Sequence, residues 1–246
     1  MPEKELRVSV CMAAFNGAKY IEIQLRSVLS QLGTADEVVI IDDCSQDDTV
    51  ARIRGVQDAR IHLIQHTENQ GVVATVEDAL RRATGDILFL SDDDDIWAET
   101  KVTRYLEVFR ARPDVQIVTS RVQLIDHEGH PYTDDRIIRK GDFSPGFWMN
   151  VYKNHYQGSA MAIRASLLER VLPFPVRPAF LHDAWIGTRN AIAGGKTAFI
   201  EEELLFYRRH SKNLSRRLSP WNQLRVRVEL LWAHASYTLR SQKQRK

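Results

Sequence analysis

Four consecutive aspartates, at positions 92–95, directly follow the strand-like residues 87–91. Two like charges about 4 Å apart repel by roughly 4 kcal/mol at an effective dielectric of 20, so four ionised carboxylates in one loop need compensation. A divalent cation would supply it, because Mg²⁺ takes oxygen ligands from one or two carboxylates together with substrate phosphates. A solvated run of charges is the alternative. The position of this run at the end of a strand favours the cation.

Two other strand-like runs also end on polar residues. Residues 7–14 stop at Phe15-Asn16-Gly17, which is a turn signal, and residues 37–42 stop at Asp42-Asp43. In a parallel sheet, ligands bind outside the carboxyl ends of the strands. We therefore expect these two loops and the acidic run to converge on one edge of a sheet.

The remaining pattern supplies that sheet. Apolar residues recur at helical spacing between the strands, and Ser45 or Asp47 can cap the second helix. Helices are predicted at residues 20–31, 72–83, 98–112, 165–171 and 183–193, and further strands at 60–65, 115–120, 158–163 and 203–209. Alternating strands and helices predict an α/β fold with a mostly parallel central sheet flanked by helices. Residues 127–146 are polar and predict a mobile or acceptor-shaping loop.

Two further residues could carry chemistry, although the pattern leaves both open. Asp183 opens a predicted helix, where the dipole stabilises an anion by about 0.3 to 1 kcal/mol, but it could equally be a helix cap. His210 follows a predicted strand and is either structural or a metal ligand.

Composition excludes several classes of protein. The 246 residues are 43% hydrophobic and 27% charged, as in ordinary globular domains. The chain lacks a G-x-G-x-x-G loop after its first strand and a G-x-x-x-x-G-K-[ST] loop, and it offers no nucleic-acid motif. No stretch is apolar enough to span a membrane, and no signal region follows Met1, so the cytoplasm is the expected location. Cys11 and Cys44 lie beside apolar runs, and we expect them to be structural thiols.

Charge is uneven along the chain. Residues 208–246 contain eleven Lys and Arg and one acid, Glu229, so they carry +10, while the preceding residues, with 23 basic and 31 acidic groups, carry −8.

Residues 221–239 predict a helix that has two opposite apolar faces on a helical wheel. One face comprises Trp221, Leu224, Val228, Leu231, Trp232, Ala235 and Leu239; the other comprises Val226, Leu230, Ala233 and Tyr237. Such a helix packs between two partners. One would be the body of the protein, and the other an anionic membrane surface or a second subunit. An ordinary packed helix with a solvated basic end is the alternative.

In this order and spacing, the motifs resemble those of bacterial family-two inverting glycosyltransferases with the GT-A fold, in particular rhamnosyltransferase-like members. Residues 8–17 (VSVCMAAFNG) resemble the first strand and nucleotide loop of the family, and residues 42–49 (DDCSQDDT) its DDGSTDDT element. Residues 69–71 (NQG) resemble its N-x-G turn, residues 85–97 its DxD loop and residues 207–213 (YRRHSKN) its Y-R-x-H segment. Asp183 stands where the family has its catalytic aspartate. Cys44 departs from the pattern, because it replaces the usual glycine.

The resemblance implies a role for each site residue. Phe15, with Ala13 and Asn16 nearby, would pack against the nucleotide base, and Asp43 would accept a hydrogen bond from it. Asp92 and Asp93 would face the ribose and the donor sugar. Asp94 and His210 would hold Mg²⁺ or Mn²⁺ on the diphosphate, and Asp183 would act as the general base.

The resemblance also implies an organisation and a function. Residues 1–219 would form the catalytic domain, with 1–112 binding the nucleotide sugar and 113–219 the acceptor, and residues 220–246 would add a basic amphipathic helix and tail. The enzyme would transfer a sugar from a UDP- or dTDP-linked donor to a saccharide or lipid-linked acceptor in surface polysaccharide or glycolipid synthesis. A nucleotidyltransferase and an inactive nucleotide-sugar-binding module are the alternatives.

Overall fold

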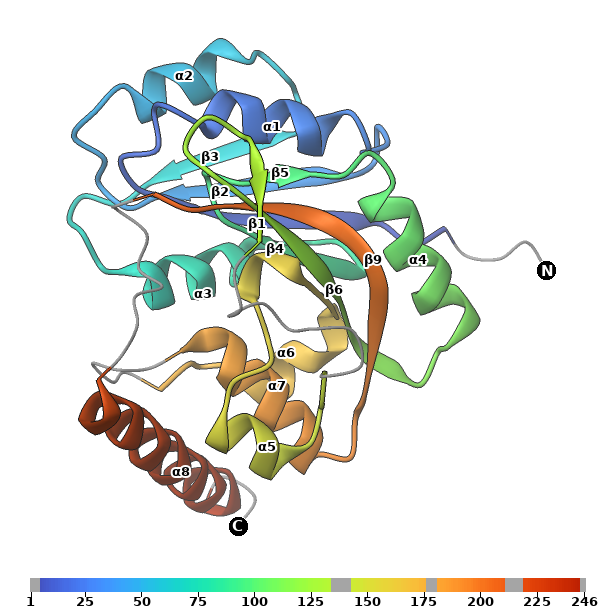
Figure 1. Ribbon diagram of the computed structural model, residues 1–246, viewed down its shortest axis with the longest axis vertical. Coiled ribbons are helices and arrows are strands. Elements are labelled where there is room, and N and C mark those ends of the chain that lie inside the picture. Colours follow the sequence, from blue (N-terminus) through green and yellow to red (C-terminus); the bar gives the residue numbers. More distant parts are fainter. Residues whose placement is uncertain (1–4, 134–142, 176–180, 211–218, 244–246) are drawn as a thin grey trace.

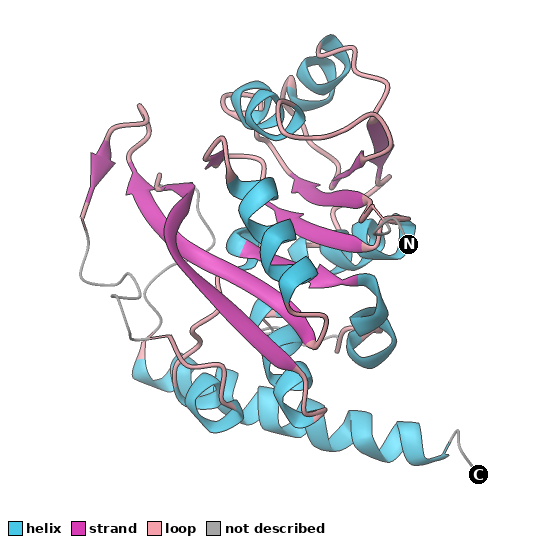
Figure 2. Ribbon diagram, turned by 90° about the vertical axis from the view of Figure 1, so that its right-hand side faces the viewer, coloured by secondary structure: helices cyan, strands magenta, loops and turns pink. Residues whose placement is uncertain are grey.

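The computed structural model describes residues 5–133, 143–175, 181–210 and 219–243. These residues form one sheet of nine strands with helices on both faces (Figures 1 and 2). The strands are β1 (Val8–Ala14), β2 (Glu37–Asp42), β3 (Ile61–Gln65), β4 (Ile87–Ser91), β5 (Ile96–Trp97), β6 (Val115–Ile125), β7 (Pro131–Tyr132), β8 (Met161–Arg164) and β9 (Lys196–Arg208). The helices are α1 (Ile21–Leu29), α2 (Thr49–Gly55), α3 (Val72–Arg82), α4 (Lys101–Ala111), α5 (Phe147–Tyr152), α6 (Leu168–Val171), α7 (His182–Ile192) and α8 (Pro220–Lys243).

The first half of the sheet is parallel, as the alternation of strands and helices predicts. Its spatial order is β3-β2-β1-β4, and all neighbouring pairs run in the same direction. Strands β1, β2 and β4 are buried almost throughout, because helices cover both faces of the sheet. Helices α1, α2 and α4 pack against the face that holds Val10 and Met12, while α3, α6 and α7 pack against the face that holds Cys11 and Val39.

The second half of the sheet is mixed. Strand β8 runs antiparallel to both β4 and β6, β6 runs parallel to β9, and β5 runs antiparallel to β9. A predominantly parallel arrangement is therefore confirmed for the first four strands, while the later strands pair in both directions.

Two strands are longer than the sequence predicts. Strand β6 continues to Ile125 and β9 begins at Lys196 rather than near residue 203. The early part of β9 mixes buried Ala198 and Ile200 with exposed charged residues, so its apolar signal is weak. Strand β9 carries the chain from α7 to the edge of the sheet where the polar loops lie, and β6 runs beside it in the same direction (Figure 1).

The polar segment 127–146, predicted as a mobile or acceptor-shaping loop, contains one short element among its described residues, strand β7, which pairs with the end of β6. Helix α5, of six residues, begins directly after the segment. Residues 134–142 of this segment lie outside the described part of the chain.

The other general expectations can be compared directly. Both cysteines are free thiols, and burial raises the pKa of Cys11. Among the described residues, no helix combines the length and apolar character needed to cross a membrane. The two-faced helix predicted at 221–239 is present as α8, and its Leu230 and Ala233 are buried against the body of the protein, as expected for one of its faces.

Candidate active site

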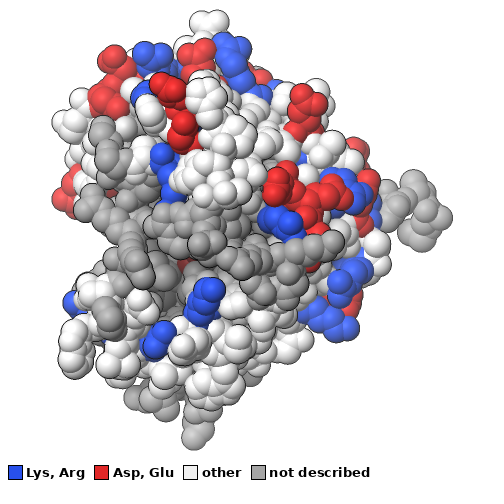
Figure 3. All heavy atoms as spheres, viewed as in Figure 1, with Lys and Arg blue, Asp and Glu red and all other residues white. Residues whose placement is uncertain are grey.

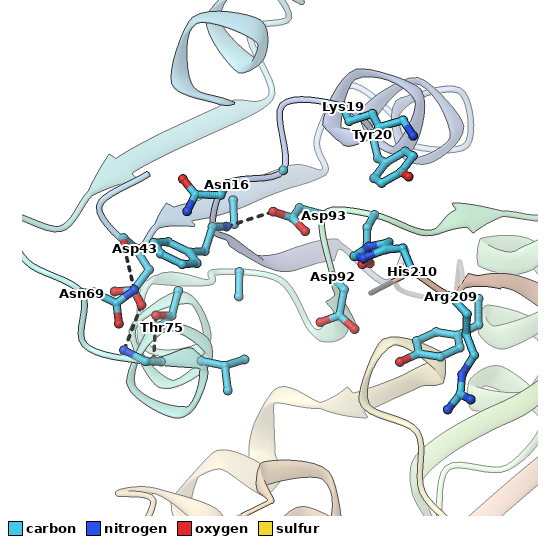
Figure 4. A pocket seen from close by; sticks show the side chains of 18 of the residues that line it. Asn16, Lys19, Tyr20, Asp43, Asn69, Thr75, Asp92, Asp93, Arg209 and His210 are labelled. Carbon is cyan, nitrogen blue, oxygen red and sulfur yellow. Dashed lines mark hydrogen bonds and ion pairs between the residues drawn. The ribbon is translucent and has the colours of Figure 1, made fainter. Parts of the chain in front are cut away.

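A large cavity opens at the carboxyl ends of β1, β2 and β4, where the three polar loops were predicted to meet (Figure 4). Its volume is about 1140 Å³. Eight of the nine predicted site residues line it: Ala13, Phe15, Asn16, Asp43, Asp92, Asp93, Asp94 and His210. The ninth, Asp183, is not among the lining residues. The cavity therefore joins residues far apart in the sequence, but it does not include the predicted base.

The loop after β1 is fastened by main-chain contacts. Asn16 has a left-handed backbone conformation (φ 53°), which asparagine tolerates better than most residues. Its N–H donates to the Ser45 hydroxyl (2.9 Å), and its side-chain oxygen accepts from the Gln46 N–H (2.8 Å). These bonds tie the first loop to the loop after β2. They leave Phe15 half exposed at the cavity wall.

Asp43 is held by three donors. Its carboxylate accepts hydrogen bonds from the N–H groups of Gln70 and Gly71, both at 2.8 Å, and lies 2.9 Å from Nδ1 of His66. Gly71 has a φ of +83°, which suits glycine, and it begins α3. Asp43 is thus fixed at the cavity wall, and its oxygens retain limited capacity for one further donor.

The acidic loop after β4 is desolvated. Burial raises the pKa of Asp92 to about 6, with a further contribution from Asp94, and burial also raises the pKa of Asp94 to about 6. The pKa values of Asp93 and Asp95 lie well above their usual range, again mainly because of burial. A cation in this loop would reverse those shifts.

Two of the four aspartates, Asp93 and Asp94, join this loop to distant segments of the chain. Asp93 Oδ2 accepts from the Phe15 N–H (2.9 Å), and it fills the space beside Gly17, where an added Cβ would lie 2.2 Å from that oxygen. Asp94 Oδ2 lies 2.9 Å from Nε2 of His210, whose ring stacks on Tyr20 with centroids 5.4 Å apart. The acidic loop is therefore joined both to the loop after β1 and to the segment after β9.

The donor set fits a hard divalent cation. Asp92, Asp94 and Asp95 each present an oxygen, and these oxygens all lie within 4.8 Å of one another. Asp95 Oδ2 is buried and has no hydrogen-bond partner, although Oδ1 accepts from the Arg208 N–H at 2.9 Å. A buried carboxylate oxygen without a partner is costly unless a cation or proton compensates it. Asp95 is thus a candidate metal ligand in addition to the predicted ligands Asp94 and His210.

Lys101 lies buried behind this loop. Its ammonium donates to the Ser159 carbonyl (2.8 Å) and lies 4.2 Å from the ring centroid of Trp97. Burial lowers its pKa to about 7, although the charges of Asp95 and Asp92 act in the opposite direction. It is a basic residue that the sequence analysis missed. The available signal was a lysine on the apolar face of α4, where Val102, Tyr105 and Phe109 are also buried.

Asp183 lies in the first turn of α7, beside the acidic loop rather than in the cavity wall. Its charge contributes to the raised pKa of Asp92, so the two carboxylates lie near each other. Burial raises the pKa of Asp183 itself, while the His182 charge and hydrogen bonds from the Ala184 N–H and the Asn154 side chain lower it. The net effect is that the pKa of Asp183 lies above the usual value for an aspartate.

Figure 4 shows how the cavity is divided. Asn16, Asp43 and Asn69 lie at one end, while Lys19, Tyr20 and His210 lie at the other with the acidic residues between them. Lys19 and Arg209 are cationic lining residues to which the sequence analysis gave no role. Arg209 lay within the recognised Y-R-x-H segment, whereas no sequence signal distinguished Lys19 from other surface lysines.

Comparison with known proteins identifies the class. Residues 9–172 match Glycosyl transferase family 2, so the chain belongs to that family. The recognised family is thereby confirmed, and this finding argues against the nucleotidyltransferase alternative.

Two relatives illustrate the range of similarity. An uncharacterized glycosyltransferase of Nostoc sp., alr2836, is 30% identical over 217 residues, which cover 85% of this chain and 66% of that protein. The putative teichuronic acid biosynthesis glycosyltransferase TuaG of Bacillus subtilis is 36% identical over 107 residues, or 43% of this chain and 42% of that protein. The matched region thus spans less than two thirds of the length of either relative.

Solved structures establish the fold. TarS of S. aureus in complex with UDP-GlcNAc has a TM-score of 0.71 at 18% identity, covering 90% of this chain and 64% of that chain. The mannosyltransferase PcManGT of Pyrobaculum calidifontis, in complex with GDP-Man and Mn²⁺, has a TM-score of 0.65 at 22% identity, covering 97% and 66%. The GT-A glycosyltransferase fold predicted by resemblance is confirmed.

Proposed function

We propose that the protein is a metal-dependent, inverting glycosyltransferase that uses a nucleoside-diphosphate sugar. One observation carries the proposal: a single cavity runs from Asp43 to an acidic loop whose oxygens fit a divalent cation. A donor with a base at one end and a diphosphate-linked sugar at the other matches that arrangement. The complexes of TarS with UDP-GlcNAc and of PcManGT with GDP-Man support a donor of this class.

The nucleoside end would bind the base and ribose. Phe15 would pack against the base, with Ala13 and Asn16 beside it, and Asp43 would accept a hydrogen bond from a ring nitrogen. The firm anchoring of Asp43 by Gln70 and Gly71 supports this role, because its position requires no rearrangement when a donor arrives.

The acidic end would hold the diphosphate and the sugar. Asp94 and Asp95 would bind Mg²⁺ or Mn²⁺, with His210 as a further ligand or a diphosphate contact. Asp92 and Asp93 would face the ribose and donor sugar, and Asp93 would also support the loop that carries Phe15. When bound, the metal would neutralise the charge that grows on the diphosphate leaving group.

Asp183 would act as the general base. It would accept the proton of the acceptor hydroxyl as that oxygen attacks the anomeric carbon from the face opposite the diphosphate. A single displacement inverts the configuration of that carbon. The raised pKa of Asp183 suits this role, because a stronger base accepts the proton more readily.

Replacing Asp183 tests the base. Asp183→Asn should lower turnover by about 10² to 10⁴-fold, because general-base assistance is lost, and should leave donor affinity within about twofold. Turnover by Asp114→Asn, which changes an exposed carboxylate at the start of β6, should match the unaltered protein. Sugar transfer by the Asp183 variant at close to the normal rate would remove the assignment.

The product would be a surface polysaccharide or glycolipid, as the name of TuaG suggests for that relative. A panel of UDP-, dTDP- and GDP-sugars with Mn²⁺, monitored by release of the nucleoside diphosphate, would identify the donor, whether rhamnosyl or another hexosyl. Failure to bind any nucleotide sugar would contradict the proposal. Binding without any turnover, in the presence of glycolipid and saccharide acceptors, would favour the inactive binding module.

The division of the catalytic domain into a donor half and an acceptor half near residue 112 is part of the same proposal. A cytoplasmic location, with attachment at the inner face of the plasma membrane, is a separate proposal that does not depend on the transfer reaction.

A further inference from the structure

Helix α8 buries one of its two apolar faces and exposes the other. Leu230, Ala233 and His234 are buried, and the ring of His234 stacks on Trp185 of α7 with centroids 4.5 Å apart. The other face carries exposed residues spaced along the helix: Trp221, Leu224, Val228, Leu231 and Trp232. Trp221 is 80% exposed and Trp232 53% exposed. Isolated exposed apolar residues are common, but a stripe with two tryptophans is characteristic of an interaction surface.

Helix α5 lies beside α8 and extends that surface. Its Trp148 is 72% exposed and its Tyr152 67% exposed. Arg227 of α8 joins the two helices, because its Nε donates to the Tyr152 carbonyl (3.0 Å) and its guanidinium lies 4.6 Å from the Tyr152 ring centroid. We define the outer apolar face as the five exposed α8 residues named above together with Trp148, Met149 and Tyr152.

The C-terminal segment that includes α8 carries a net positive charge in the sequence. Residues 220–246 contain six Lys and Arg and a single acid, Glu229, which is paired with Arg225 at 2.8 Å. Figure 3 shows the same trend on the side that it displays: acidic side chains lie over the upper part of the molecule, whereas the lower part shows basic and uncharged ones. Figure 1 places α5 and α8 in that lower part.

These features discriminate between possible occupants of the outer apolar face. A second copy of the chain docked by the same face would bring two basic segments together, and like charges oppose that contact. An anionic bilayer attracts the basic residues, each contributing about 1 kcal/mol near the surface. Tryptophan and tyrosine favour the boundary between lipid and water, since they combine an apolar ring with a polar group.

We propose that α5 and α8 form a membrane-binding surface that rests on anionic phospholipid without crossing the bilayer. The exposed aromatic rings insert between the headgroups, and the basic residues contact lipid phosphates. This inference does not depend on the donor or on catalysis, so it can fail while the proposed glycosyltransferase function holds.

Vesicle flotation tests the proposal with the whole chain and no donor present. We expect binding to phosphatidylcholine vesicles that contain phosphatidylglycerol, weak binding to pure phosphatidylcholine, and release at high salt, because screening weakens the attraction to anionic lipid. The double variant Trp221→Ser/Trp232→Ser should bind anionic vesicles at least about tenfold more weakly, because it removes two apolar side chains from the contact.

A matched control comes from the opposite end of the molecule. Ile23 of α1 is 51% exposed, and Ile23→Ser should leave vesicle binding unchanged. Trp148→Ser extends the test to α5, where it should also weaken binding. Circular dichroism melts would verify that the variants fold, which we expect because the replaced side chains are exposed.

Quenching of tryptophan fluorescence by brominated lipids gives an independent readout. The exposed tryptophans should be quenched on anionic vesicles, whereas Trp97 and Trp185, which are buried, should not. Absence of binding to anionic vesicles at low salt would overturn the proposal. So would a solution dimer, detected by analytical ultracentrifugation, that dissociates in the Trp221→Ser/Trp232→Ser variant, because a second copy would then cover the face.

Discussion

Two acidic loops lie at the same edge of the sheet, but the carboxylates of the two loops differ in their hydrogen bonding and in their pKa values. In the loop after β2, Asp43 accepts from two main-chain N–H groups and contacts His66, and Asp47 accepts from the Thr49 and Ala18 N–H groups. In the loop after β4, oxygens of Asp92, Asp94 and Asp95 lie within 4.8 Å of one another, and burial raises the pKa of every aspartate from 92 to 95. The number of acids in a loop therefore does not identify a cation site. Desolvated carboxylates whose oxygens lie close together do.

The largest expected effect comes from the loop after β4. Asp94→Asn should lower turnover by about 10³-fold or more, because a cation that stabilises the leaving group loses a charged ligand. We also expect Mn²⁺ to raise the melting temperature of the unaltered protein and not that of the variant. Differential scanning fluorimetry with and without Mn²⁺ measures the second effect without a substrate.

A second acidic group offers the control for that variant. Glu128, with Asp126 and His130, forms an exposed cluster after β6, and Glu128→Gln should leave both turnover and the response to Mn²⁺ unchanged. An equal loss of the Mn²⁺ response in both variants would contradict the assignment of the cation to the loop after β4.

A smaller effect is expected in the loop after β2. Asp43→Asn should destabilise the fold by about 1 to 3 kcal/mol, because an amide cannot accept from all the donors that surround this carboxylate. The Michaelis constant for the donor should increase, while the response to Mn²⁺ should be retained. Urea unfolding and donor titrations measure these quantities. Loss of the Mn²⁺ response would indicate that both loops serve the cation.

Binding of Mn²⁺ at the loop after β4 should depend on pH. Asp92 and Asp94, with pKa values of about 6, are largely protonated below that pH and ionised above it. Cation binding requires the ionised form, so the apparent affinity for Mn²⁺ should fall by up to about tenfold per unit as the pH decreases from about 7 to 5. Isothermal titration calorimetry at several pH values would measure this slope. A flat profile would argue that protons and the cation do not compete at this loop.

The smallest effect concerns the turn after β2. Cys44 has a φ of 64°, the left-handed conformation that the glycine usual in the family adopts freely. Cys44→Gly would relieve that strain but increase the entropy of the unfolded chain, so the free energy of unfolding should change by less than about 1 kcal/mol. Urea unfolding would show it. A loss greater than about 2 kcal/mol would mean that the thiol contributes contacts that outweigh the backbone strain.

The sequence predicted the parallel half of the fold well, because its strands are short, mostly apolar and bounded by turn residues. Strand β2 was predicted at its observed limits, residues 37–42, and β3 within one residue. The convergence of Phe15, Asp43 and Asp94 on one cavity followed from the rule that parallel strands end at the same edge. Strand β9 was predicted too short because its first half is partly exposed and carries charged side chains.

Contacts between distant segments could not be predicted. Nothing in the sequence indicates that Asp93 accepts from the Phe15 N–H or that the Lys101 ammonium donates to the Ser159 carbonyl, since both depend on how distant segments are placed in three dimensions. Asp183 was expected at the same site, and the structure places it next to Asp92 but outside the lining of the cavity.

Helix α7 links two regions that have been described separately. Its first turn carries both Asp183 and Trp185, and the Trp185 ring lies 4.5 Å from the ring of His234 in α8. Thr188, about one turn further along, places its Oγ1 2.9 Å from Nε2 of the same histidine. The C-terminal helix is therefore packed against the body of the protein through α7. A chain truncated before Pro220 would uncover the Trp185 ring and loosen the helix that carries Asp183. Any loss of activity in such a truncation would have to be separated from loss of membrane attachment before it is interpreted.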